Sequence, residues 1–145
     1  LWVDRDNVYW LDPTEEATVS YLTDIANELR VLGFREVVFL DFQIPDDSNV
    51  ALGGDHRAIL ENLAQNLLIS CGTNAFAVSF ETVGEFTLPE GRSRVYKTEV
   101  DAIEAKNIAE NSGVSDVQTR LVFITDLYDT RFDEYSVLRP LSFAE

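Results

Sequence analysis

Three short apolar runs of this sequence end on an acidic residue, in the strings FLDF, SFE and ITD. The acids are Asp41, Glu81 and Asp126. If the runs are parallel strands of one sheet, their carboxyl ends meet at the same edge, where ligands and catalytic groups lie in α/β enzymes. Two carboxylates at such an edge can hydrolyse a glycosidic bond, one as protonated acid and the other as nucleophile or base. The sequence therefore predicts a carboxylate site, with Asp41, Glu81 and Asp126 as candidate catalytic residues.

Structural roles for the same acids stay open. The chain has 26 acidic residues, so an acid could stand at a strand end by chance, as the cap of the next helix, or as the partner of an arginine such as Arg35, Arg120 or Arg131. A divalent cation could also be held by oxygen ligands from the acids at positions 41, 46, 47, 81 and 126. No EF-hand spacing is present, and Asp46 and Asp47 have the character of turn residues. We therefore expect no metal.

Other catalytic arrangements have weaker support. No GxSxG motif is present, and the single histidine, His56, follows Asp55 at the expected start of a helix, where it would be solvated or capping. The single cysteine, Cys71, excludes a disulfide within the chain and a cysteine-rich zinc site. Four aromatic side chains could stack on a sugar ring, with core packing as the alternative for each: Trp2, Tyr9, Trp10 and Phe42.

The elements that must position these acids begin with a well-marked helix. Asp12 can cap it, Pro13 suits its first position, and Glu15 follows at the third. Gly33 can close its far end. These signals predict a helix over residues 14–32, whose apolar positions recur at helical spacing.

Helices and strands then alternate along the chain. Apolar spacing predicts a second helix over residues 56–71, with Gly72 as its terminator. Thr98 and Asp101 predict the opening of a third helix over residues 100–113. The tail from residue 127 is expected to be loop with a short helix. Four strands are expected, over residues 36–42, 75–81, 93–97 and 120–126. The first of them is apolar on both faces, as parallel strands covered on both sides are.

This alternation, with crossovers of 15 residues or more, predicts an α/β fold with a mainly parallel sheet. A complete (β/α)8 barrel takes about 250 residues, and four or five strands are close to half of it. We therefore predict a TIM-barrel-like fold that is a partial or half barrel, the C-terminal part of a (β/α)8 barrel. Its open edges would be paired in a homodimer or completed by a missing N-terminal half. No cofactor is expected, because neither GxGxxG nor GxxxxGK follows a strand.

Length and charge limit the class of protein further. The chain of 145 residues is 46% hydrophobic and 26% charged, which fits a single domain over residues 1–145. A net charge of −15 repels phosphate backbones, so we expect no nucleic-acid partner. No apolar run approaches the roughly 20 residues of a membrane span, so we expect no membrane insertion.

One part of the chain, residues 8–45, resembles a known family. A Trp-Leu-Asp-Pro turn opens the first helix, Leu-Gly-Phe ends it, and Asp-Phe with a later Pro closes the strand, at positions 10–13, 32–34, 41–42 and 45. These motifs resemble the glycosyl hydrolase-like domain family of bacteria, whose strand closes on Phe-Asp-Tyr-x-Arg-Phe-Pro. Gln43 stands where that family has Arg, and the spacing from acid to Pro is one residue shorter. The rest of the chain shares only the order of strands and helices.

The resemblance implies a TIM barrel, a carbohydrate-active role and an extracellular or cell-envelope location, with Asp41 in the place of the family's strand-end acid. The residues expected to contact a sugar are Trp10, Phe42 and Gln43. The expected function is a glycoside hydrolase-like domain that acts on or binds a polysaccharide or cell-wall glycan through strand-end carboxylates. The alternative is a non-catalytic module of the same fold that binds a carbohydrate or a protein.

Overall fold

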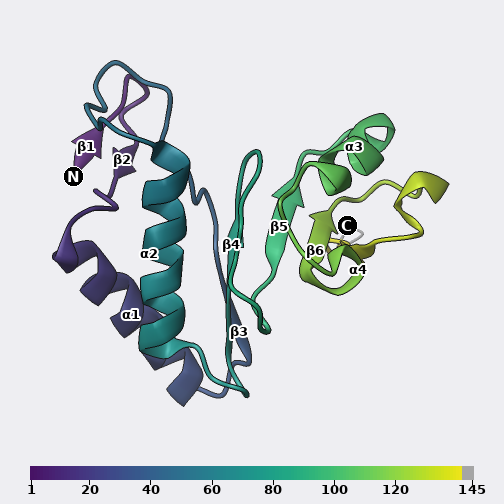
Figure 1. The fold of residues 1–145 in the computed structure, drawn as a ribbon, viewed down its shortest axis with the longest axis horizontal. Helices are drawn as coiled ribbons and strands as arrows, with labels where there is room; N and C mark the ends of the chain where they lie inside the picture. Colours follow the sequence, from purple (N-terminus) through teal and green to yellow (C-terminus); the bar gives the residue numbers. More distant parts are fainter. Residues whose placement is uncertain (142–145) are drawn as a thin grey trace.

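A small β-hairpin precedes an alternation of helices and strands (Figure 1). The computed structural model describes residues 1–141. Its elements are β1 (Trp2–Val3), β2 (Tyr9–Trp10), α1 (Glu16–Val31), β3 (Glu36–Phe39), α2 (His56–Cys71), β4 (Ala77–Glu81), β5 (Val95–Thr98), the 3-10 helix η1 (Ala102–Glu104), α3 (Ala105–Glu110), α4 (Val117–Arg120), β6 (Leu121–Ile124), the 3-10 helix η2 (Thr130–Phe132) and β7 (Ser136–Leu138).

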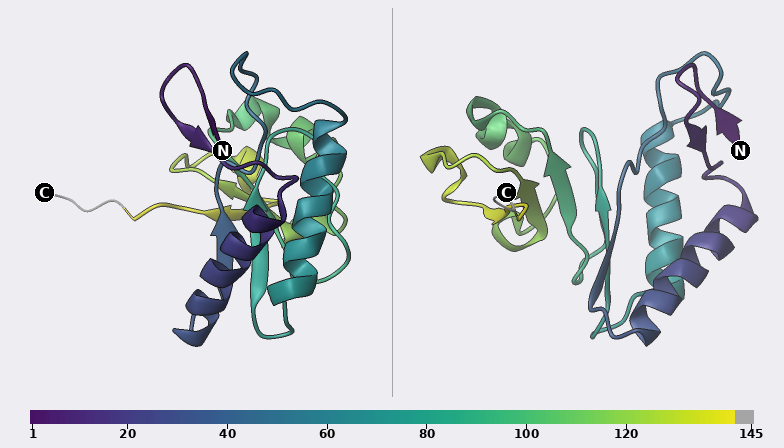
Figure 2. Two further views of the ribbon diagram at one scale, coloured as in Figure 1. Left: turned by 90° about the vertical axis from the view of Figure 1, so that its left-hand side faces the viewer. Right: turned by 180° about the vertical axis from the view of Figure 1, so that it is seen from behind.

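Five strands form one parallel sheet in the order β3-β4-β5-β6-β7, which is also their order along the chain. The prediction of an α/β fold with a parallel sheet is therefore confirmed. The long helices α1 and α2 lie side by side at the β3 end of the sheet, while α3 lies near β6 and β7 (Figure 2). Among the described residues, no helix has the length and apolar character needed to cross a membrane.

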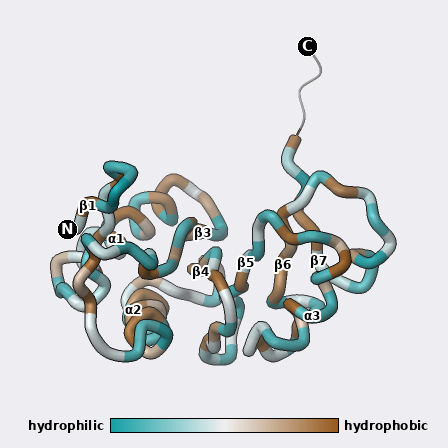
Figure 3. Tube along the Cα trace, turned by 90° about the horizontal axis from the view of Figure 1, so that it is seen from above, coloured by the Kyte–Doolittle hydropathy of each residue, from teal (hydrophilic) through white to brown (hydrophobic). Residues whose placement is uncertain are grey.

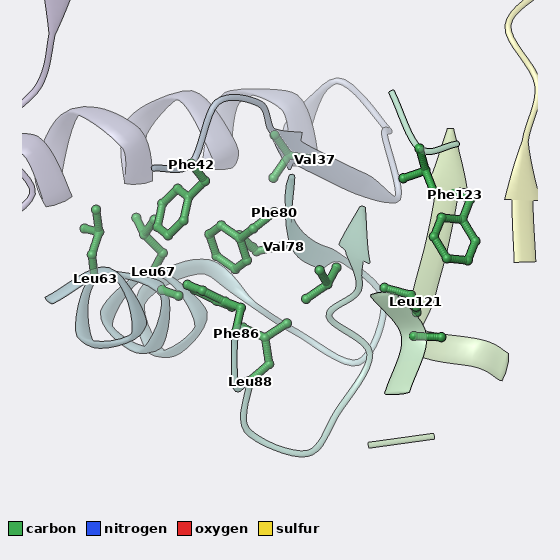
Figure 4. Packing of buried hydrophobic residues seen from close by; sticks show 14 of the residues in the cluster. Val37, Phe42, Leu63, Leu67, Val78, Phe80, Phe86, Leu88, Leu121 and Phe123 are labelled. Carbon is green, nitrogen blue, oxygen red and sulfur yellow. The ribbon is translucent and has the colours of Figure 1, made fainter. Parts of the chain in front are cut away.

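One face of the sheet carries the hydrophobic core. Strand register places Val37 beside Val78, and Phe80 beside Val95. Because side chains alternate between the two faces of a strand, these four share the face that packs on the helices. Phe80 lies at the centre of an aromatic group, 4.5 Å from Phe42 and 6.3 Å from Phe86 between ring centroids, while leucines of α2 lie beside the group (Figure 4).

The other face of the sheet is covered by no helix of the described chain, and α2 and α3 both lie on the opposite side of the row of strands (Figure 3). The uncovered face carries a polar cluster around Glu36. The Glu36 carboxylate accepts hydrogen bonds from Ser79 Oγ at 2.6 Å, Tyr96 Oη at 2.7 Å and the Arg94 guanidinium at 3.0 and 3.1 Å. Burial of the phenol raises the pKa of Tyr96, and its hydrogen bond to Glu36 raises it further.

Helix α1 begins two residues later and ends one residue earlier than predicted. Asp12 does not cap it: the Asp12 carboxylate instead accepts hydrogen bonds from the N–H and the hydroxyl of Thr14, which makes a turn before the helix. At the other end Gly33 has a φ of +98°. The N–H of Phe34 donates to the carbonyl of Leu29 at 3.1 Å, which completes a Schellman motif.

Several other expectations need correction. Strand β3 ends at Phe39 instead of residue 42. It is not buried on both faces, because only Val37 of its four residues is buried and no helix of the described chain covers the face that carries Glu36. Thr98 belongs to β5 and does not cap a helix, since Asp101 caps the 3-10 turn η1 instead. The tail contains η2 and the unpredicted strand β7, and residues 142–145 of it lie outside the described residues.

Candidate functional site

Four successive strands each have an acid at their carboxyl end. Glu81 is the last residue of β4, Asp41 follows β3 by two residues and Asp126 follows β6 by two. Glu99, which directly follows β5, is a fourth such acid that the sequence prediction missed. Because the sheet is parallel throughout, all four lie along one edge, which we call the strand-end edge. The predicted gathering of strand-end acids at one edge is therefore present, with one more member.

Asp41 and Glu81 are in direct contact. The backbone N–H of Asp41 donates to Glu81 Oε2 at 2.9 Å, and the next N–H, of Phe42, donates to the Glu81 carbonyl at 3.0 Å. The other carboxylate oxygen, Glu81 Oε1, accepts from the hydroxyl of Thr98 at 2.7 Å. Asp41 itself has a φ of +51°, a left-handed conformation that Asp and Asn tolerate best after Gly. This bend turns the chain out of β3 and leaves the Asp41 side chain exposed.

Asp41 borders a hollow of about 250 Å³ together with Trp10 and Gln43. The remaining walls are mainly apolar and come from the hairpin, from α1, from α2 and from the end of β3. Five residues that the sequence analysis offered for a carbohydrate site therefore line one space: Tyr9, Trp10, Asp41, Phe42 and Gln43. An apolar wall with a carboxylate and an amide at its rim is a combination that can hold a sugar ring and hydrogen-bond its hydroxyls.

The hairpin that supplies Trp10 is held in place by polar contacts. The Trp10 indole N–H donates to Asp4 Oδ2 at 2.8 Å, and this hydrogen bond holds the pKa of Asp4 below its usual value. Arg5 forms an ion pair with Asp47 at 3.0 Å, which joins the hairpin to the loop after β3. Hydrogen bonds from the backbone N–H of Asn49 and from Arg5 lower the pKa of Asp47. The indole is thus oriented by its own hydrogen bond, next to the loop that carries Gln43.

Phe42 lines the same hollow and also belongs to the hydrophobic core. Its side chain is only 7% exposed and belongs to the core, where it packs against Phe80 and, edge to face at 5.9 Å, against Phe86 (Figure 4). Both rings border the hollow, Phe42 as a nearly buried core residue and Trp10 as a half-buried one.

Glu81 and Asp126 open onto other spaces. Glu81 lines a neighbouring hollow of about 440 Å³ with Thr98 and Glu99, and Asp126 lines a third of about 660 Å³ between β5 and β6. Asp41 and Glu81 are therefore the adjacent pair, and Asp126 is separated from Glu81 by the width of β5. Within residues 1–141, no three His, Cys, Asp or Glu side chains come together in a group that could hold a metal ion.

The structural alternatives for these acids can be checked against the contacts. The acids whose side chains cap helical turns are Asp55, Asp101 and Asp129, and none of them is a strand-end acid. Arg120 donates to the backbone carbonyls of Ser93 and Pro89 and to Ser115, and Arg131 pairs with Asp129. Helix capping and pairing with these two arginines therefore do not account for Asp41, Glu81 or Asp126.

Comparison of the chain with family models, with curated proteins and with solved structures gave no match in any of the three.

Proposed function

We propose that this chain is a glycoside hydrolase-like domain that acts on or binds a polysaccharide or cell-wall glycan through its strand-end carboxylates. The observation that carries the proposal is the contact of Asp41 with Glu81, at the rim of a hollow that also holds Trp10 and Gln43. Carboxylates supply hydrogen-bond acceptors for sugar hydroxyls, and an aromatic wall supplies apolar contact. An extracellular or cell-envelope setting belongs to the same proposal and has its support in the resemblance of residues 8–45.

The finer architecture is also proposed. A sheet whose spatial order equals its sequence order, with right-handed crossovers, receives all its helices on one face, as a (β/α)8 barrel does. An open doubly wound sheet would instead reverse its order at a switch point. We infer a partial TIM barrel whose outer strands, β3 and β7, are paired by a second copy or by an N-terminal half. Light scattering tests the first of these, since a monomer at all concentrations would contradict a homodimer.

Hydrolysis requires one carboxylic acid that protonates the leaving oxygen and one carboxylate that acts as nucleophile or base. Asp41 and Glu81 are the proposed pair. Glu81 already accepts hydrogen bonds on both carboxylate oxygens, from Asp41 N–H and Thr98 Oγ1. Asp41 is exposed, so its carboxyl group is the one that can move a proton to or from a bound sugar.

Glu81 and Gln43 also support the non-catalytic alternative. Both Glu81 oxygens are engaged within the protein, and Gln43 offers an amide where the resembling family has the planar fork of Arg. A module of this kind would hold a glycan by Asp41, Gln43 and Trp10 and leave it intact.

Assays on a panel of polysaccharides and cell-wall glycans distinguish the hydrolytic proposal from the non-catalytic alternative. Release of reducing ends is measured for the wild type, for Asp41→Asn and for Asp24→Asn, an exposed acid of α1 that serves as the matched control. If the domain is hydrolytic, Asp41→Asn should slow turnover by about 100-fold or more, as loss of a general acid or base does. Its melting temperature should hold, because Asn tolerates the left-handed backbone at this position.

Calorimetric binding of the same glycans, with the intact oligosaccharide recovered, would select the non-catalytic alternative. Unchanged turnover and unchanged binding in Asp41→Asn would refute both, because Asp41 is central to each.

A further inference from the structure

The hollow beside Asp41 has a negative rim with no positive charge to balance it. Among the described residues that line this hollow, Asp41 is the one with a charged side chain. The Asp41 side chain is exposed, and none of the ion pairs among residues 1–141 involves it. Tyr9 and Trp10 contribute aromatic rings to the same lining. An exposed carboxylate beside aromatic rings attracts a cation that is carried on a partly apolar body.

The negative charge continues along the strand-end edge. Glu81, which contacts Asp41, lines the neighbouring hollow of about 440 Å³, and Glu99 lines both that hollow and the one of about 660 Å³. The acids that line these two hollows are Glu81, Glu99, Asp101, Glu104 and Asp126, and all except Glu81 are exposed. The three hollows therefore follow one another along the edge, and carboxylates line each of them.

Lys97 is the one cationic side chain among the described residues that line these hollows, and the protein uses its hydrogen-bonding capacity. Lys97 is 5% exposed. Its Nζ donates to the carbonyl of Thr82 at 3.0 Å, to the hydroxyl of Thr82 at 3.1 Å and to the carbonyl of Gly84 at 2.7 Å. An ammonium ion has three N–H donors, and these contacts use all of them. The edge therefore presents carboxylates, and not an amine, to a ligand.

The spacing of these acids suits a chain of sugars. Neighbouring strands lie about 4.8 Å apart, which is close to the length that one pyranose ring occupies in an extended glycan. Sugars that carry carboxylates would meet like charge along the row, and uncharged sugars would gain no electrostatic attraction from it. A glycan with an ammonium group on each ring would meet opposite charge instead. Each exposed ion pair of this kind raises the affinity by up to about fivefold.

We propose that the glycan bound at this edge is a polymer of amino sugars with free amines, that is, of de-N-acetylated hexosamine. One ring stacks on Trp10 with its ammonium group at Asp41, and the following rings place theirs beside Glu99 and Glu104. This inference rests on the proposed glycan function and names the substrate class of that same site.

Calorimetry at pH 6, where the sugar amines are protonated, compares three oligosaccharides of equal length. They are an oligomer of glucosamine, an oligomer of N-acetylglucosamine with the same linkage, and an oligomer of galacturonate. The first two differ only in the acetyl group that removes the charge of the amine. The glucosamine oligomer should bind at least about tenfold more tightly than the N-acetylated one, and the galacturonate oligomer should show no binding.

A chain with a net charge of −15 attracts any polycation, so paired variants separate the edge from the rest of the surface. The edge variant Glu99→Gln/Glu104→Gln removes two charges from the hollow of about 440 Å³. The matched control Asp24→Asn/Glu28→Gln removes two exposed charges from α1. The edge variant should weaken binding of the glucosamine oligomer by about five- to tenfold and leave binding of the N-acetylated oligomer unchanged, whereas the control should change neither by more than about twofold.

Equal losses in the two variants would overturn the inference, because the attraction would then come from the net charge of the whole chain. Equal or tighter binding of the N-acetylated oligomer, or binding of galacturonate, would also overturn it and would leave the glycan proposal standing. Absence of binding by all three would overturn the amino-sugar class as well, and the panel of polysaccharides and cell-wall glycans would then show whether the glycan proposal fails with it.

Discussion

The substitution Lys97→Met gives a stability change whose pH dependence can be worked out from the structure. The pKa of Lys97 is about 8 in the folded protein, against an ordinary value of 10.5. Between these two pH values the unfolded chain binds a proton that the folded protein does not, so the free energy of unfolding rises with pH. Summed from pH 7 to pH 9.5, this linkage adds roughly 2 kcal/mol to the wild type and nothing to the variant.

Urea denaturation of both proteins at several pH values in this window measures the effect. The difference in unfolding free energy between wild type and Lys97→Met should move in favour of the wild type as pH rises. Groups that titrate in both proteins, including Tyr96, cancel in this difference. Lys106→Met serves as the control, because Lys106 is largely exposed and its substitution should leave the pH dependence unchanged.

A difference that stays constant from pH 7 to pH 9.5 would refute the argument. It would mean that Lys97 keeps its proton in the folded protein throughout this range, held by Thr82 and Gly84 as an ammonium ion. A difference that moves in favour of the variant would mean that the folded state raises the pKa of Lys97.

Three further substitutions test the packing around the site, each by urea denaturation. Tyr96→Phe removes the 2.7 Å hydrogen bond to Glu36 and should lower the free energy of unfolding by about 2 kcal/mol. Tyr9→Phe, at an exposed hairpin position, is the control and should leave the stability unchanged. Equal effects of the two substitutions would contradict a stabilising role of the polar cluster around Glu36. Phe42→Ala should cost about 3–5 kcal/mol because it leaves a cavity beside Phe80, and a loss below about 1 kcal/mol would place Phe42 outside the core. Gly33→Ala should cost about 1 kcal/mol from its φ of +98° alone, since open space surrounds the added methyl group.

Local signals of the sequence predicted the elements well where the signal and its partner are close along the chain. Gly33 ends α1 by donating its N–H to the carbonyl of Arg30, while Phe34 donates to Leu29. Asp55 caps α2 by accepting from the N–H of Ala58, three residues away. The alternation of these helices with apolar runs was sufficient to predict the parallel sheet. Asp12 shows the limit of this approach, because an acid at this spacing can either form a turn before the helix or cap the start of the helix.

The sequence predictions were wrong where contacts between residues far apart in the chain determine the local structure. Thr98 has the spacing of a helix cap with Asp101, but its hydroxyl bonds to Glu81, which lies 17 residues earlier in the chain. Because Thr98 was assigned to a helix, Glu99 was not recognised as a strand-end acid. Extending the strand signal SRVYK by one residue, to Thr98, would have placed Glu99 directly after a strand.

The aromatic residues show the same dependence on distant partners. Trp10 ends the short strand β2 and Phe42 follows β3 by three residues, and both could face a sugar or a core. Phe42 is covered by Phe80 from the neighbouring strand and by Phe86 from a later loop, neither of which is near it in sequence. Trp10 is fixed at the hollow by Asp4, in a hairpin too short to be predicted.

The central claim is that a glycan binds at the strand-end edge beside Asp41. The most direct test is a titration of isotope-labelled protein with cell-wall oligosaccharides, followed by the amide signals in NMR spectra. If a glycan binds there, the signals of Asp41, Gln43 and the indole N–H of Trp10 should shift together with one dissociation constant, while signals of α4 and β7 stay in place. Shifts of other residues only, with the signals of Asp41 and Trp10 unchanged at saturation, would contradict glycan binding at this edge.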